Sequence, residues 1–433
     1  MKTTQRMHSG KAGRPVLSIA FLLGLLLVIS SVQGQTRITS PYSIYGPGEL
    51  RFNQNFRNLG MGGLSVAHRS NRSVNDVNPA SYTARDTISF VFEATAFSHF
   101  YRQATDDMSQ YGNYSSLGQL SLSFPITKWW AMGAGLKPFS SVGYKVRDFD
   151  VDPGIGMMNY VYEGEGGINQ AFFGTAISPF NGLSVGVNAS YLFGRFEHHT
   201  SVYSDSVAIF LTNKIVSNQV NGWHFGFGAQ YEFRPTETSS YTFGAIYGGE
   251  NPIAATRNEL VRRILPGTMS RYDTISIDQG LEGDLVIPSY WGAGVFARLN
   301  NHWRVGVEYK QQNWENYSLF DTRDNLSNSH QVAFGVQHNP AIQTFSTVWD
   351  RLEYRAGFRY GQSYLMPRDE PLSEFGISFG LGIPLRRSLS SLQVGFEYSQ
   401  RGTTEQNLIK ENFYRFNIGI SIYEHWFVRR RFF

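Results

Sequence analysis

From residue 87 onward the chain repeats one pattern seven times, in which alternating strands are joined in turn by short turns and long connections. In residues 182–194 the large apolar side chains occupy every second position, with Leu192 as the one exception. Successive side chains of a strand point to opposite faces, so one face of each strand is apolar and the other is small or polar. A closed transmembrane β-barrel needs this pattern in every strand, with one face toward lipid and the other toward a lumen.

The pattern predicts an all-β fold, a transmembrane antiparallel β-barrel of about 14 strands that spans residues 87–433. We expect the strands at 87–98, 115–124, 129–138, 166–178, 183–194, 221–233, 240–248, 285–297, 302–311, 330–338, 352–361, 373–383, 391–400 and 412–423. The long external loops are then expected at 99–114, 139–165, 195–220, 249–284, 312–329, 362–372 and 401–411. The other connections are short, except for 339–351, and an even strand count places both termini in the periplasm.

A soluble β-sandwich or propeller also alternates, and three features weigh against it. The outward-facing residues are aromatic at many strand ends, the connection lengths alternate, and the chain ends in Trp426-Phe427 and Phe433. This aromatic ending is similar to the C-terminal signals that assembly machinery reads on outer-membrane barrels. We therefore expect the outer membrane as the location, its lipid as a neighbour and the barrel assembly machinery as a partner during insertion.

The first 34 residues are typical of a signal peptide. Lys2, Arg6, Lys11 and Arg14 precede an uncharged apolar run of 14 residues, 16–29, and small residues follow before Gln35. An uncleaved anchor is the alternative, but no basic cluster follows the apolar run. Without the leader, Lys+Arg and Asp+Glu are balanced at 34 each, because the leader holds four of the 38 basic residues. This balance gives no reason to expect a nucleic-acid partner, and the absence of cysteine excludes a lipoprotein anchor.

Residues 35–86 do not alternate, and they precede a barrel that is too wide for its own side chains to fill. The segment contains Gly60-Met61-Gly62-Gly63, then Asn78-Pro79-Ala80, and several apolar residues that a solvated tail would not need. We expect an N-terminal hatch in the lumen, and a disordered periplasmic tail is the alternative.

The Gly60-Met61-Gly62-Gly63 cluster followed by Asn78-Pro79-Ala80 resembles the N-terminal hatch of the FadL/TodX family of outer-membrane transporters for hydrophobic compounds. PorV-type proteins of the type IX secretion system are similar in fold, and the C-terminal half, with Tyr354-Arg355-Ala356-Gly357-Phe358, resembles Bacteroidetes members of this group. The resemblance implies a fourteen-stranded barrel with a hatch in which Gly60, Gly62, Gly63, Asn78, Pro79 and Ala80 gate the ligand path. A simple turn at Asn78-Pro79-Ala80 is the alternative.

The third expected strand contains Gly133, Gly135 and Pro138, and proline cannot donate to a strand ladder. The resemblance implies a lateral opening for ligand at these residues. The alternative is that Pro138 ends the strand at the membrane surface.

Charged residues on the expected lumen face form a candidate network: Arg304, Glu308, Arg355, Arg359, Glu397 and Arg415, with Lys310 and Glu232 nearby. Such residues pair with one another or hold the hatch, and Arg355 and Arg359 are the candidates for an anionic head group. An apolar ligand pocket is expected at Phe139, Val142, Met157, Met158 and Tyr160, unless that connection covers the surface.

Enzyme chemistry has one candidate cluster, His198-His199 with Ser201 and Asp205, in an expected external loop. Neither a nucleophile elbow nor an HExxH spacing occurs, and adjacent histidines on a strand face opposite ways. We therefore expect no enzyme, no cofactor and no metal. The first functional hypothesis is passive uptake of small hydrophobic compounds such as fatty acids; the alternative is a PorV-like barrel that binds protein partners, such as a secretion system, and does not transport.

Overall fold

A computed structural model describes residues 40–51, 55–154, 156–204, 211–264, 272–340, 349–385 and 388–425, which lie in one compact unit. The expected leader, residues 1–34, lies outside the described residues, as do Asp205, Trp426, Phe427 and Phe433. Among the described residues, no helix is both long enough and apolar enough to cross a lipid bilayer.

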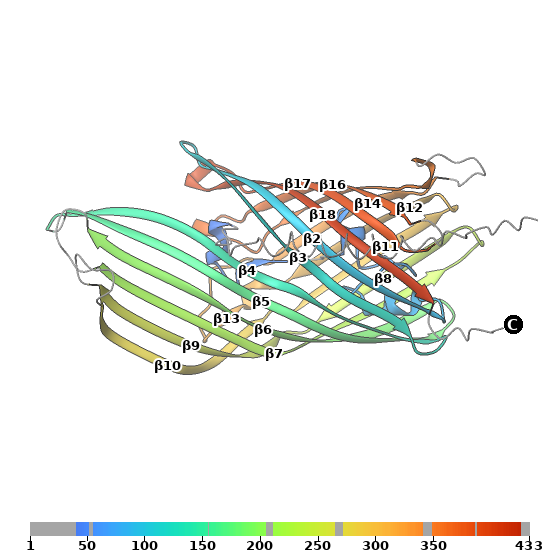
Figure 1. Cartoon of the computed structure of the whole chain (residues 1–433), viewed down its shortest axis with the longest axis horizontal. Coiled ribbons are helices and arrows are strands. Elements are labelled where there is room, and N and C mark those ends of the chain that lie inside the picture. The colour runs from blue at the N-terminus through green and yellow to red at the C-terminus, as the bar shows by residue number, and fades with distance from the viewer. Residues whose placement is uncertain are drawn as a thin grey trace, which may run out of the picture. The chain divides into compact units, whose positions relative to one another are not determined.

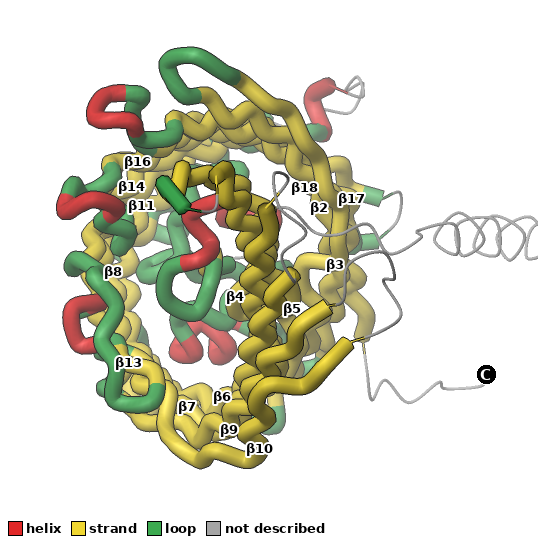
Figure 2. The backbone as a smooth tube through the Cα atoms, turned by 90° about the vertical axis from the view of Figure 1, so that its left-hand side faces the viewer, coloured by secondary structure: helices red, strands yellow, loops and turns green. Residues whose placement is uncertain are grey.

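The described chain forms a closed antiparallel β-barrel, which Figures 1 and 2 show from the side and from one end. The wall elements are β2 (Ser89–Ala104), β3 (Ser109–Pro125), β4 (Trp130–Asp152), β5 (Gly156–Phe180), β6 (Leu183–Ser204), β7 (Leu211–Phe233), β8 (Ser240–Gly248), β9 (Asn251–Ile264), β10 (Tyr272–Ile287), β11 (Tyr290–Leu299), β12 (Trp303–Gln312), β14 (Ser329–His338), β15 (Glu353–Gln362), β16 (Ser373–Pro384), β17 (Ser391–Arg401) and β18 (Lys410–His425). The last strand, β18, pairs with β2 along its whole length and closes the wall.

The wall has fourteen strands, because β8 with β9 and β10 with β11 are two strands that each contain one break. β7 pairs with β8 near one end and with β9 near the other, and β11 likewise continues the line of β10. Pro288, which has no N–H to donate, lies in the break between β10 and β11. The predicted fold class and strand number are confirmed.

The outer surface of the barrel is apolar at alternating positions, as the sequence predicts. In β7 the outward residues Trp223, Phe225, Phe227, Tyr231 and Phe233 are each about half exposed. Exposure alternates without a break along β8 as well. Because a water-soluble surface of this kind would aggregate, this band faces lipid, and the protein is an outer-membrane barrel.

Six strands extend far beyond the rest of the wall, at the left in Figure 1: β4, β5, β6, β7, β9 and β10. We call these extensions the wing, and they comprise residues 139–154, 156–167, 195–204, 211–220, 251–264 and 272–284. The expected external loops at 139–165, 195–220 and 249–284 are therefore wrong, and so is most of the loop at 99–114, because β2 and β3 continue to Ala104 and from Ser109. Outside the bilayer the apolar alternation ends, although the backbone pairing continues.

The short elements lie in the hatch and in the connections. They are the 3₁₀ helices η1 (Pro41–Ile44), η2 (Pro79–Ala84), η3 (Trp314–Asn316), η4 (Trp349–Arg351), η5 (Pro367–Asp369) and η6 (Glu405–Asn407), the helix α2 (Phe56–Leu59), and the two-residue strands β1 (Glu49–Leu50) and β13 (Ser318–Leu319). The connections at 312–329, 362–372 and 401–411 are thus loops as expected, with short helices and β13 in them. We call the end of the barrel opposite the wing the turn end, after its short connections.

Candidate functional site

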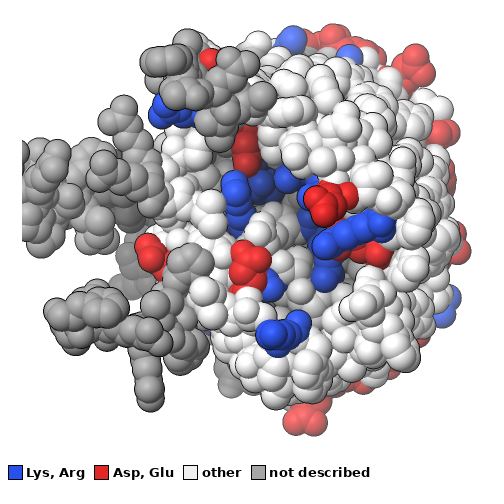
Figure 3. Space-filling view, turned by 90° about the vertical axis from the view of Figure 1, so that its right-hand side faces the viewer, with Lys and Arg blue, Asp and Glu red and all other residues white. Residues whose placement is uncertain are grey.

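Residues 55–86 lie inside the barrel, and we call this segment the hatch. Figure 2 shows it inside the ring of strands, and Figure 3 shows the turn end filled, with charged side chains gathered around its centre. The packed apolar residues of the hatch include Met61, Leu64, Val66, Val74 and Tyr82, all at most 2 % exposed. They pack against the inner face of the wall and against one another, so protein fills this end of the bore.

Glycines of the wall form the seat of the hatch. Gly306, Gly335 and Gly357 stand opposite one another on β12, β14 and β15. A Cβ atom on Gly357 would lie 2.0 Å from the amide nitrogen of Gly62, and one on Gly335 would lie 2.5 Å from the carbonyl oxygen of Met61. The hatch backbone therefore lies directly against the wall backbone, which only glycine permits.

The glycines of the hatch are required for backbone shape and for close packing against the wall. Gly62 and Gly63 have φ angles of +69° and +86°, a region that glycine adopts without strain. Gly60 lies against Gly380 of the wall, where a Cβ would be 3.1 Å from its Cα. These residues are explained by packing and by backbone shape, and a gating role for them stays a prediction.

Asn78 fixes the start of η2 and ties it to the wall. Its side-chain oxygen accepts a hydrogen bond from the Ala80 amide, and its side-chain amide donates to the carbonyls of Val66, Ala229 and Ala245. Pro79, the first residue of η2, needs no hydrogen-bond acceptor for its nitrogen. The chain turns at Asn78-Pro79-Ala80, and the Asn78 side chain is fully buried between hatch and wall.

Two buried carboxylates of the wall hold the hatch backbone. Glu308 of β12 accepts hydrogen bonds from the amides of Ser65 and Val66 at 2.6 and 2.8 Å. Glu93 of β2 accepts from the amide of Val74 at 3.0 Å and from the side-chain amide of Asn55 at 2.9 Å. Hydrogen bonds to a charged group contribute about 1.5–3 kcal/mol each. The hatch is therefore held by charge as well as by apolar contact.

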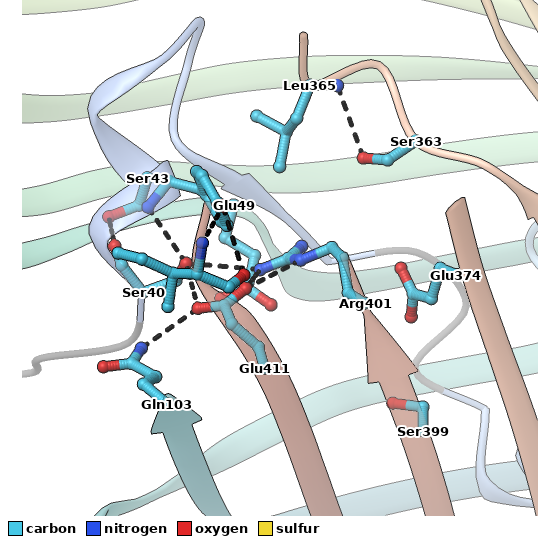
Figure 4. Close-up of polar contacts among 12 residues, drawn as sticks. Ser40, Ser43, Glu49, Gln103, Ser363, Leu365, Glu374, Ser399, Arg401 and Glu411 are labelled. Atoms are coloured by element: carbon cyan, nitrogen blue, oxygen red, sulfur yellow. Dashed lines mark hydrogen bonds and ion pairs between the residues drawn. The ribbon is translucent and has the colours of Figure 1, made fainter. Parts of the chain in front are cut away.

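An N-terminal arm, residues 40–51, closes the bore toward the wing. Its strand β1 pairs with Ser140 and Ser141 of β4. Figure 4 shows Ser40 near the base of the arm, where its hydroxyl donates to Glu411, which also pairs with Arg401 at 2.6 Å. The arm packs into the largest buried apolar cluster of the described chain, which includes Tyr42, Trp314, Tyr317 and Tyr364.

A cavity of about 340 Å³ remains between the hatch and the arm. Most of its lining surface is apolar, with Leu50, Ile246 and Trp291, and charged side chains form part of the rest. Arg359 contacts Glu374 at 2.6 Å and Glu397 at 3.0 Å, and Arg415 contacts Glu397 at 2.6 Å. The cavity also contacts Glu49, Arg51, Asp76, His99, Lys137, Lys310 and Arg401.

The six charged residues predicted from the sequence divide into separate groups. Arg359, Glu397 and Arg415 meet as expected, together with Glu374, which the sequence analysis missed. Glu308 binds the hatch instead. Arg304 and Arg355 belong to a further cluster at the turn end, with Arg57 and Glu353. The strand register decides these groups, and no sequence signal reveals it.

Of the five residues expected to form an apolar ligand pocket, only Phe139 lines this cavity. Val142 is buried in the apolar cluster that closes the wing end. Met157, Met158 and Tyr160 lie on β5 in the wing, near the end of the β4–β5 hairpin. The expectation fails for these three because the segment continues as a strand and does not fold back into the bore.

β3 and β4 are hydrogen-bonded only near the turn that joins them, and farther from this turn the two strands are not paired. The pairing of β3 with β4 ends at Leu120 opposite Leu136, and β4 has a register shift between Pro138 and Ser140. A second cavity of about 290 Å³ lies there, lined by Arg51, Phe97, Tyr114, Ser116, Pro138, Ser140, Ser141, Gly166, Gly167, Asn169, Gly194 and Arg195. Pro138 does not end its strand, because β4 continues to Asp152.

Gly133 and Gly135 have packing reasons of their own. A Cβ on Gly133 would lie 2.7 Å from the ring of Tyr82, and one on Gly135 would lie 2.5 Å from the carbonyl oxygen of Leu120. Neither has a positive φ angle. A part in lateral opening therefore stays a prediction for all three residues of this strand.

The two histidines of the candidate enzyme cluster lie on β6, and Asp205 of that cluster lies outside the described residues. His198 faces the Tyr144 hydroxyl at 2.7 Å, whereas His199 faces Glu197 at 3.1 Å, so the two rings point to opposite sides of β6 as expected. His199, Glu197 and Glu165 lie close enough on the wing to share one cation. Glu197 is already paired with Arg195.

Solved structures with the same fold include a hydrocarbon channel, a toluene transporter and a FadL homologue. A monoaromatic hydrocarbon channel, CymD, has a TM-score of 0.57 at 14 % identity, over 86 % of this chain and 97 % of that one. The Pseudomonas putida toluene transporter TodX has 0.55 at 14 % (87 % and 99 %), and a Pseudomonas aeruginosa FadL homologue has 0.53 at 13 % (85 % and 98 %). The FadL/TodX resemblance is thus confirmed for the fold.

Curated protein sequences give no match to this chain. One family model does match, over nearly the whole length of the sequence, from residue 17 to residue 433. The match covers both the N-terminal segment inside the barrel and every strand of the wall. The chain therefore belongs to the BamG family.

Proposed function

We propose that this barrel is a partner-binding component of outer-membrane protein assembly that works with its lumen closed. The observation that carries the proposal is the wing, a six-stranded sheet that projects beyond the apolar band and has two free edges. The family name supports the same conclusion, since it points to the barrel assembly machinery.

One free edge is β10. Among the described residues, its only partner on the side away from β9 is β13, which pairs with Leu285 and Val286. Residues 272–282 are exposed on both faces of the strand, including Ile275, Ile277 and Leu281. A free strand edge is a template for an added strand of another chain, so it suits a partner in extended conformation.

The negative charge of β10 indicates which side chains a partner strand should carry. β10 contains Asp273, Asp278, Glu282 and Asp284, and no lysine or arginine. A partner strand beside it is therefore favoured when it carries lysine or arginine.

The closed lumen supports a role without transport. Backbone hydrogen bonds and buried carboxylates hold the hatch, and the arm closes the other end. The cavity between them has charged groups such as Arg359 and Glu374 in a lining that is otherwise largely apolar. An apolar solute would have to displace the water that solvates these groups, which costs free energy.

The test places a photocrosslinking residue at Ile277 on β10 and, as a control, at Phe358, an outward residue of the wall. The proposal predicts a crosslink to a component of the barrel assembly machinery from Ile277 and none from Phe358. Equal yields from both positions, in correctly folded protein, would contradict it.

Uptake of small hydrophobic compounds, such as fatty acids, is the second candidate function, and one observation favours it. The gap between β3 and β4 beside Pro138 leads to a cavity in the wall, where a solute could leave sideways. In this proposal Asn78 and the hatch glycines gate the path from the bore.

The chain has no cysteine, so a lock across this gap can be introduced cleanly. Ser116→Cys together with Ser140→Cys, joined by a short bis-maleimide, would bridge the two sides of the cavity. Uptake of a labelled fatty acid or toluene by cells should exceed that of cells without the protein and fall when the bridge is formed. Equal uptake with and without the protein would exclude transport of that compound.

A further inference from the structure

Four arginine side chains converge on one carboxylate at the turn end of the lumen, and a fifth, Arg298, stands beside one of them, Arg304. Arg57 and Arg72 come from the hatch, and Arg298, Arg304 and Arg355 come from β11, β12 and β15. The carboxylate is Glu353: Arg57 Nη1 lies 3.2 Å from its Oε2, Arg72 Nη1 lies 4.0 Å from its Oε1, and Arg355 pairs with it more closely.

The strand register places three of these arginines in one row across the inner wall. Arg298 stands directly opposite Arg304, Arg304 opposite Gln337, and Gln337 opposite Arg355. Like charges directly opposite on neighbouring strands are destabilising. The row is therefore a built concentration of positive charge, and Glu353 alone does not neutralise it.

Several of the donors in this cluster have nothing to bind. Arg57 is 1 % exposed, and its Nε and Nη2 lack a hydrogen-bond partner among the described residues. The Nε of Arg298 is also buried and also lacks a hydrogen-bond partner among the described residues. A buried donor without a partner costs about 1–3 kcal/mol, and more when it is charged. Buried polar groups are normally paired, so these donors point to a missing acceptor.

Glu93 is the other buried carboxylate that acts on Arg57 and Arg355. Glu93 also interacts with Arg85, and its carboxylate accepts hydrogen bonds from Asn55 and Val74 of the hatch. Even counted in full, two carboxylates against five arginines leave an excess of three positive charges, five minus two.

We propose that this arginine cluster is a binding site for a tetrahedral oxyanion of the phosphate class, either free or as the head group of a lipid. Guanidinium groups from the hatch and from the wall approach from different sides, and such groups offer N–H donors to oxygen acceptors. Arg57 supplies two donor nitrogens without an acceptor, whereas Arg355 already donates to Gln337, Gln393 and Glu353 and contributes its charge. A phosphate with nearly two negative charges matches the excess better than a carboxylate does.

The site is accessible from the turn end. The Arg72 side chain is 41 % exposed there, while the deeper Arg57 and Arg355 side chains are each 1 % exposed. Figure 3 shows basic and acidic side chains together around the centre of this end. The anion would bridge the hatch to β11, β12 and β15, which the proposed partner-binding function does not require.

The test uses the purified mature protein in a non-ionic detergent, with inorganic phosphate as the probe at constant ionic strength against chloride. Calorimetry and thermal unfolding measure binding for the wild type, Arg72→Gln and Arg304→Gln. Arg234→Gln is the matched control, because this exposed arginine lies at the turn end and pairs with Glu232 instead. Phosphate should bind the variants about tenfold more weakly than the wild type and the control.

A second readout separates this role from a merely structural one. Without phosphate, Arg304→Gln should unfold at a temperature no lower than the wild type, because it removes repulsion from Arg298. Short-chain phosphatidic acid, used below its micelle concentration, distinguishes the two sources of the anion. Binding of either probe that depends on Arg72 and Arg304 supports the proposal. Equal binding by all four proteins, or none above chloride, overturns it.

Discussion

At the scale of single residues, the inner wall has two kinds of position that hold the hatch: some must lack a side chain, and others must carry a charged one. Gly357 leaves room for the Gly62 backbone, and Glu308 supplies the acceptor that two hatch amides need. Sequence alternation predicts that both residues face inward, but it cannot say which of them the hatch touches. That depends on the path of residues 55–86, which have no periodic pattern.

Gly357→Ala tests the empty positions. Its new Cβ would collide with the Gly62 amide, so the hatch must shift or leave, at a cost of about 1–3 kcal/mol. We expect limited proteolysis to cleave within 55–86 in this variant. Gly395→Ala is the matched control, because its Cβ would find its nearest neighbour at 3.6 Å, an ordinary contact. Equal resistance of the two variants would contradict the role of the glycine seat.

Glu308→Ala tests the charged positions. The change leaves the amides of Ser65 and Val66 buried without their acceptor, which costs about 1–3 kcal/mol for each. Hydrogen exchange of these two amides should become faster, and Glu308→Gln, which keeps one oxygen acceptor, should have a smaller effect. Glu237→Gln, on an exposed connection, should leave the exchange unchanged.

His68 makes the hatch sensitive to pH. Burial, and then the charges of Arg57, Arg304 and Arg355, hold its pKa well below the usual range, against a weaker opposite effect of Glu353. The released hatch binds a proton at His68 once the pH falls below about 6.5, whereas the docked hatch does not, so docking weakens as the pH falls. Proteolysis of the hatch should therefore increase from pH 7.5 to pH 5.5. His68→Gln should reduce this increase, and an unchanged pH profile would contradict the role of His68.

At the scale of elements, the sequence predicts the membrane-spanning part of every strand and misses the ends of the strands in the wing. The alternation of Trp223, Phe225 and Phe227 exists because lipid touches one face of β7. Beyond the lipid, β10 has water on both faces, so its residues carry no alternation to detect. The register between strands, which assembles Arg298, Arg304 and Arg355, is equally invisible in one sequence.

The β9–β10 part of the wing should be separable from the barrel. Ala255 and Gly283 are paired, so residues 256–282 can be replaced by Asn-Gly, a two-residue turn. The wall below is held by β8 with β11, from Gly248 opposite Tyr290 onward. We expect the shortened protein to keep its heat-dependent shift on gels and to unfold within about 5 °C of the wild type. It should no longer copurify with the assembly component that the wild type binds. A protein that fails to insert would contradict the independence of the wing.

At the scale of the whole molecule, a channel fold is combined with a bore that is closed twice. The even strand count, the inward glycines and an N-terminal segment with apolar residues are all visible in the sequence. The closure by the arm is not, because Ser40 meets Glu411 across 371 positions of the chain.

In planar bilayers, the purified protein should show no steady conductance, because the hatch and the arm both block the bore. Removal of residues 40–86 should open a steady ion-conducting pore. Steady conductance of the wild type equal to that of this deletion variant would show that the bore is open in the membrane.

The contacts of Ser40 also set an order of events in biogenesis. Glu411 of β18 stands opposite Gln103 of β2, and both side chains meet beside the Ser40 hydroxyl. This is the seam at which the first and last wall strands join. The first described residue of the chain thus gains its binding place only after the final strand has been inserted. The arm can therefore bind only after the barrel has closed, and in a barrel that lacks its last strand the arm would stay unbound.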